Sequence, residues 1–63
     1  MYKFIEGKEI IGMTKIAEKV GIDLSTLSRI VHGKQTTSKM TAYCIVKSIN
    51  KNAEIKDYFI KLR

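Results

Sequence analysis

Cysteine and histidine are almost absent from this 63-residue chain, which contains one of each, Cys44 and His32. A single thiol cannot form a disulfide bond within the chain, and one cysteine with one histidine cannot supply the four ligands of a structural zinc site. We therefore expect no metal and no other cofactor. The absence of disulfides favours a reducing, cytoplasmic setting.

Proline is absent, and so are long apolar runs. Without proline, no helix is interrupted by a residue that lacks a backbone N–H. No apolar run reaches the roughly 18 residues needed to span a bilayer. The start of the chain also lacks the pattern of a secretory signal peptide. We therefore expect no membrane partner.

The parts of an enzyme active site are missing as well. Acidic residues are few, and no spacing of side chains suggests a nucleophile with its base. The glycines do not form a loop that would hold a phosphate group of a cofactor. We therefore expect that the protein is not an enzyme and has no small-molecule substrate.

Basic residues, by contrast, are plentiful: 12 Lys and Arg face 6 Asp and Glu, for a net charge of +6. Residues 24–53 contain no acidic residue, because all the acids lie before or after this segment. A surface of spaced cations without acids suits a polyanion, although a solvated basic face without a partner is the alternative. The cations of the segment are Arg29, Lys34, Lys39, Lys47 and Lys51.

The length indicates one domain, residues 1–63, and the apolar spacing predicts that it is helical. Residues 13–20 have helical spacing and are followed by Gly21, which favours a helix end. Asp23 is a good N-cap for a helix over residues 24–32, and Gly33 then ends it.

Two further helices are expected in the second half of the chain. Ser38 can cap a helix whose buried stripe is Ala42, Ile45, Val46 and Ile49. Residues 54–62 repeat apolar side chains at i, i+3, i+4 and i+7, which predicts a last helix that packs on its own core or on a second copy.

The first eleven residues are open to two interpretations. Residues 2–11 form a short first helix, or residues 2–5 are extended. Together with the helices above, the expected fold is all-α, with four or five short helices and little or no sheet.

Residues 13–32 form a unit of two short helices joined by a turn of about three residues, which is the helix-turn-helix geometry. Ala17 is small where the two helices approach, and Gly21 opens the turn. The outward positions of the second helix include no acid, as a surface that faces a DNA groove requires. These positions are Leu24, Ser25, Ser28, Arg29 and His32.

The run from Ile16 to Ile30, followed by Gly33 and Lys34, resembles the Cro/phage-repressor (XRE-like) helix-turn-helix family. The similarity continues where that family has the cap and core residues of its next helix. It covers over half the chain. The matching residues beyond the motif are Ser38, Thr41, Ile45 and Ile49.

The resemblance implies a lambda-repressor-like domain in which residues 24–32 are the recognition helix. It implies contacts to base edges from Leu24, Ser25 and Arg29, with Arg29 able to pair with a guanine through two hydrogen bonds. It also implies contacts to the DNA backbone from the helix and the loop and cap that follow it. These residues are Thr26, Ser28, His32, Lys34, Gln35, Thr36, Ser38, Lys39 and Thr41.

The favoured hypothesis is therefore a sequence-specific transcriptional regulator of phage Cro or repressor type, in the cytoplasm of a bacterial or phage-infected cell. It would bind double-stranded DNA as a homodimer on a near-palindromic operator. One alternative is a helical protein-interaction module with an incidental basic face. Another is a DNA-binding antitoxin or an excisionase-like accessory protein.

Overall fold

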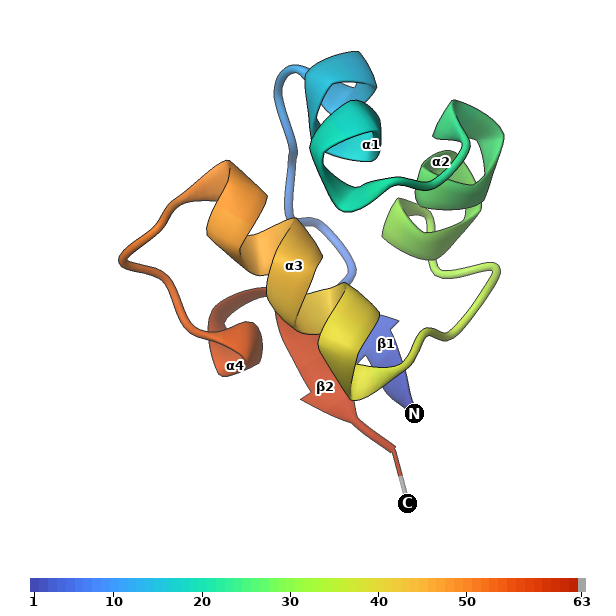
Figure 1. Ribbon diagram of the computed structural model, residues 1–63. Coiled ribbons are helices and arrows are strands. Elements are labelled where there is room, and N and C mark those ends of the chain that lie inside the picture. Colours follow the sequence, from blue (N-terminus) through green and yellow to red (C-terminus); the bar gives the residue numbers. More distant parts are fainter. Residues whose placement is uncertain (63) are drawn as a thin grey trace.

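In the computed structural model, which describes residues 1–62, three helices of two to three turns pack together beside a short sheet formed by the two ends of the chain (Figure 1). The predicted mostly helical architecture is confirmed, with the addition of a two-stranded sheet that an all-α fold lacks. In chain order, the elements are β1 (Tyr2–Phe4), α1 (Met13–Val20), α2 (Leu24–Val31), α3 (Lys39–Ile49), α4 (Ile55–Tyr58) and β2 (Phe59–Lys61).

The turn between α1 and α2 forms where glycine predicts it. Gly21 ends α1 with a positive φ of 84°, and its N–H donates a hydrogen bond to the carbonyl of Ala17 at 2.8 Å. A glycine adopts this left-handed conformation without the steric penalty that a Cβ would bring. The chain then enters α2 after only three residues, so α1 and α2 are held close together.

The predicted caps of the next two helices have different outcomes. Asp23 occupies the N-cap position of α2, but its carboxylate makes no capping hydrogen bond. Ser38 does cap α3, because its hydroxyl oxygen accepts a hydrogen bond from the N–H of Thr41 at 3.3 Å. Helix α2 ends at Val31, one residue before the predicted end, and His32 is its C-cap.

The first residues are extended, so the helical interpretation of residues 2–11 is wrong. Tyr2–Phe4 form β1, which pairs antiparallel with β2 and places Phe4 opposite Phe59. On its other edge, β1 pairs with Thr37: Tyr2 and Thr37 exchange two backbone hydrogen bonds of 2.7 and 2.9 Å. The start of the chain is thus fixed between its end and the loop before α3.

The predicted helix over residues 54–62 is also wrong in most of its length. A single turn, α4, forms over Ile55–Tyr58, and Asp57 accepts a hydrogen bond from the Glu54 N–H at 2.8 Å. The chain then extends into β2. Extended backbone allows Phe59 to point inward while Ile60 points outward, and β1 supplies the hydrogen bonds that a helix would have supplied locally.

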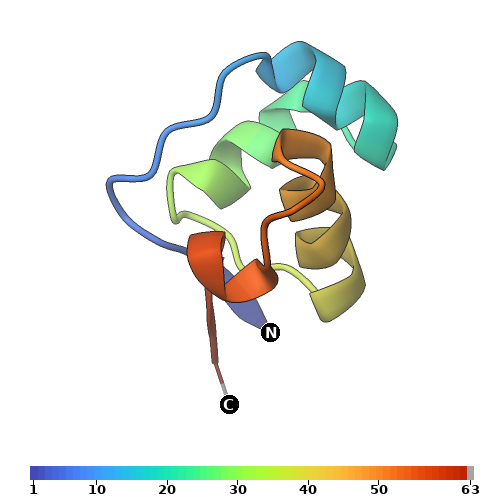
Figure 2. The same ribbon diagram turned by 90° about the vertical axis from the view of Figure 1, so that its left-hand side faces the viewer.

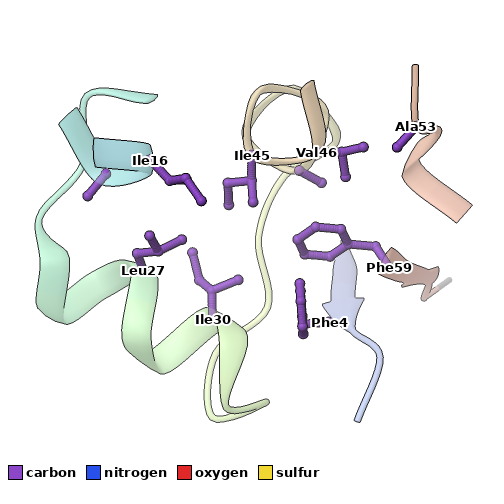
Figure 3. Packing of buried hydrophobic residues seen from close by; sticks show 10 residues of the cluster. Phe4, Ile16, Leu27, Ile30, Ile45, Val46, Ala53 and Phe59 are labelled. Atoms are coloured by element: carbon purple, nitrogen blue, oxygen red, sulfur yellow. The ribbon is translucent and has the colours of Figure 1, made fainter. Parts of the chain in front are cut away.

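The core lies where the three longer helices meet the inner side of the sheet, and Figure 3 shows its side chains pointing toward one another. The rings of Phe4 and Phe59 meet edge to face, with their centroids 5.2 Å apart. Of the stripe predicted on α3, Ala42, Ile45 and Val46 are buried, whereas Ile49 is only partly so. The buried apolar residues are Phe4, Ile16, Ala17, Leu27, Ile30, Ala42, Ile45, Val46, Ala53 and Phe59.

Replacement of Phe4 by alanine tests whether the N-terminal strand is part of this core. We expect Phe4→Ala to lower the free energy of unfolding by about 3–5 kcal/mol, most of the stability of so small a domain. Urea unfolding followed by circular dichroism measures the change. The control is Ile60→Ala on the paired strand, whose side chain is 53% exposed and which should change stability by less than about 0.5 kcal/mol. Equal losses from the two variants would contradict this packing.

Candidate nucleic-acid interface

Helix α2 has one buried and one open face. Leu27 and Ile30 are buried against the core, while Ser25 and Arg29 are exposed and Leu24 is 48% exposed. This division follows from the helical period, since residues three and four apart share a face. The three residues predicted to read base edges therefore lie together on the open side of α2.

The guanidinium group of Arg29 is held by two neutral partners. Its Nε donates a hydrogen bond to Oε1 of Gln35 at 3.1 Å, and its Nη2 donates to the hydroxyl of Thr26 at 3.3 Å. Three residues predicted to contact DNA are thus joined, although Gln35 lies in the loop after the helix. Neither partner is a carboxylate, so these hydrogen bonds orient the guanidinium group but do not neutralise its positive charge.

At the other end of α2, His32 closes the helix with its side chain. Its Nδ1 lies 2.7 Å from the carbonyl oxygen of Ser28 and 3.2 Å from the Ser28 hydroxyl. A carbonyl only accepts hydrogen bonds, so Nδ1 donates to it, and Nε2 of the neutral ring is then a hydrogen-bond acceptor. His32 is exposed and lies three residues after Arg29, so the helical period places both on one side of α2.

The loop after α2 is anchored at both ends. The Lys34 N–H donates to the carbonyl of Arg29 at 2.9 Å, and Thr37 pairs with Tyr2 as described above. Between these anchors, Lys34 is exposed and Thr36 is half-buried. The predicted backbone-contact residues of the loop are therefore carried on a short, tethered segment rather than on a free one.

The first turn of α3 presents the remaining candidates. Ser38 and Lys39 are exposed, and Thr41 is half-buried. The Ser38 hydroxyl caps the Thr41 N–H and also donates to the Thr41 hydroxyl at 3.1 Å. The N–H groups of the first two residues of a helix have no carbonyl one turn earlier to bond with, so those of Lys39 and Met40 remain to meet an acceptor such as a phosphate oxygen.

Not every cation of the acid-free segment belongs to this surface. The ammonium group of Lys47 donates to the carbonyls of Ala53 at 2.8 Å and Lys51 at 3.2 Å, where it stabilises the turn before α4. It also lies 5.4 Å from the centre of the Tyr43 ring. A count of charged residues along the sequence cannot detect that Lys47 stabilises this turn, because its hydrogen-bond acceptors are backbone carbonyl oxygens.

Other kinds of site find no support among residues 1–62. No three His, Cys, Asp or Glu side chains in this range are placed to hold a metal ion. None of the helices described has the length and apolar character needed to cross a bilayer. Comparison with known proteins gives no match to a family model, a curated protein or a solved structure.

The cap of α3 can be tested separately from any contact that the Ser38 hydroxyl makes. Ser38→Ala should lower the free energy of unfolding by about 1 kcal/mol, whereas Ser38→Gly should lower it by only a few tenths, because glycine tolerates the N-cap position. Thermal unfolding compares the two with Ser25→Ala, which removes a hydroxyl from an exposed position of α2. If Ser38→Ala is as stable as Ser25→Ala, the Ser38 hydroxyl does not stabilise α3 as a cap.

Proposed function

We propose that the chain is a sequence-specific, DNA-binding transcriptional regulator that places α2 in the major groove. The observation that carries the proposal is the open face of α2, on which Leu24, Ser25 and Arg29 are exposed together beside no acidic residue of their own helix. A helix fits the major groove of B-DNA, and a guanidinium group can bind O6 and N7 of one guanine.

The loop and helix that follow α2 support the same proposal. Lys34 and Lys39 add positive charge next to α2, and the first turn of α3 offers backbone N–H groups. Contacts of this kind hold a protein in register on the DNA backbone without reading its sequence. Base reading from α2 and backbone contacts from residues 34–41 are thus assigned to separate, neighbouring segments.

We further propose that the protein acts as a homodimer on a near-palindromic operator. Each chain carries one α2, and the largest extent of the chain is 29 Å. Successive half-sites on one side of the double helix lie about 34–36 Å apart, so two copies are needed to place a helix in each. Occupation of such an operator would exclude RNA polymerase from an overlapping promoter.

Selection from a pool of random DNA duplexes tests this function directly. The expected result is a two-fold symmetric consensus, bound at least about 10³ times more tightly than a scrambled duplex in a titration at fixed salt. Weak, salt-sensitive binding without a consensus would favour an accessory or architectural role. Absence of duplex binding would refute the proposal and favour a helical protein-interaction module.

Replacement of Arg29 tests the base-reading role of α2. Arg29→Ala should weaken binding to the selected duplex by about 1–3 kcal/mol and relax the preference at one base pair, with a smaller effect on scrambled DNA. Lys56→Ala is the control, since Lys56 is an exposed cation on α4, which lies on the other side of α3 from α2 in Figure 1. Equal losses of Arg29→Ala on the selected and scrambled duplexes would show that Arg29 contacts only the backbone.

A further inference from the structure

A hollow of about 490 Å³ opens beside the C-terminal end of α2, between that end and the N-terminal segment. Figure 2 shows residues 5–12, in blue, passing this end of α2 on the left of the view. Of the residues that line the hollow, only His32 was predicted from the sequence to contact DNA. Its lining residues include three polar side chains of the N-terminal segment, Lys3, Glu6 and Lys8.

Lys3 is brought to α2 by the pairing of β1 with both β2 and Thr37. It lies opposite Ile60 on the outer side of the sheet and is exposed. A Cβ at Gly33 would lie 3.6 Å from Cε of Lys3, which places the end of this side chain beside the residue that follows His32. The stem of Lys3 therefore packs on the end of α2 while its ammonium group remains available.

Lys8 is positioned by an aromatic ring instead of a carboxylate. Its Nζ lies 5.5 Å from the centre of the Tyr58 ring, within the range of a cation–π interaction. Such an interaction restricts the ammonium group without removing its charge. Lys8 is also exposed, so a ligand that enters the hollow can reach it.

Glu6 opposes these charges but does not form an ion pair with them. Within residues 1–62, one ion pair is formed, between Lys56 and Glu54 at 3.8 Å, and it does not involve Glu6, Lys3 or Lys8. With Glu6 counted against Lys3 and Lys8, the hollow keeps a net positive charge. A group with negative charge and several acceptor oxygens fits this combination.

We propose that Lys3 and Lys8, beside His32, bind a DNA backbone phosphate that flanks the major groove contacted by α2. This inference rests on the proposed function, because it assigns the phosphate to the same duplex. His32 belongs to both surfaces, so the N-terminal segment extends the interface continuously from the end of α2. The interface would then combine residues from the start of the chain with the acid-free segment 24–53.

The salt dependence of binding tests the proposal with the double variant Lys3→Gln/Lys8→Gln. Glutamine keeps much of the length of the side chain and removes its charge. Each phosphate contact contributes about 0.9 to the slope of log affinity against log salt. Between about 50 and 200 mM salt, wild-type affinity should therefore fall about 3- to 4-fold more than that of the double variant, equally on the selected and scrambled duplexes.

The matched control is Lys51→Gln/Lys56→Gln, which has the same net charge. In Figure 1, α4 and the loop before it lie to the left of α3, whereas α2 lies to the right. This control should keep the wild-type slope. The opposite change, Glu6→Gln, should tighten binding to both duplexes, because it removes the negative charge that lines the hollow.

Three results would overturn the proposal. If the two double variants have the same slope, the lysines act only through net charge, and the proposed function of α2 stands. If Lys3→Gln/Lys8→Gln weakens binding to the selected duplex alone, these lysines read bases instead of a phosphate. If the wild-type protein binds no duplex at all, the proposed function fails together with this inference. Circular dichroism spectra of all variants identify any loss of folding.

Discussion

The contact between Phe4 and Phe59 joins the two ends of the chain, and the rest of the structure depends on it. The edge-to-face pair, with ring centroids 5.2 Å apart, lies where β1 and β2 pair and faces the buried side chains of α2 and α3. A sheet of two strands is marginal by itself in water. Here it is stabilised by the helices, and it covers the side of their core that would otherwise meet solvent.

The same strand pairing positions the proposed interface. Because β1 pairs with β2 on one edge and with Thr37 on the other, the loop between α2 and α3 is fixed to the sheet. That loop carries Gln35, which orients Arg29. The geometry of the open face of α2 therefore depends on residues at both ends of the chain, although none of them belongs to α1 or α2.

Signals that act within one turn of helix were predictable from the sequence. Gly21 ends α1 with a positive φ, and Ser38 caps α3, because each depends on its own backbone and on neighbours within four residues. The segment after Glu54 was not predictable in this way. Its apolar residues suit a helix as well as a strand, and β1, more than fifty residues earlier, decides between them. The buried and open faces of α2 followed from periodicity, whereas the partners of Lys3 and Lys47 did not. Lys3 lies beside Gly33, thirty residues later, and Lys47 bonds to carbonyl groups of a turn whose backbone path periodicity does not describe.

Two positive groups of the proposed interface share a property that the amino-acid composition does not reveal. Arg29 is held by an amide and a hydroxyl, and Lys8 by an aromatic ring. An ion pair would have to be broken, at an energetic cost, before a phosphate or a base could replace the carboxylate. A neutral partner orients the cation and can be exchanged for a stronger, charged acceptor when DNA arrives. Arg29 and Lys8 are thus oriented by neutral partners, and neither positive charge is neutralised by a carboxylate of the protein.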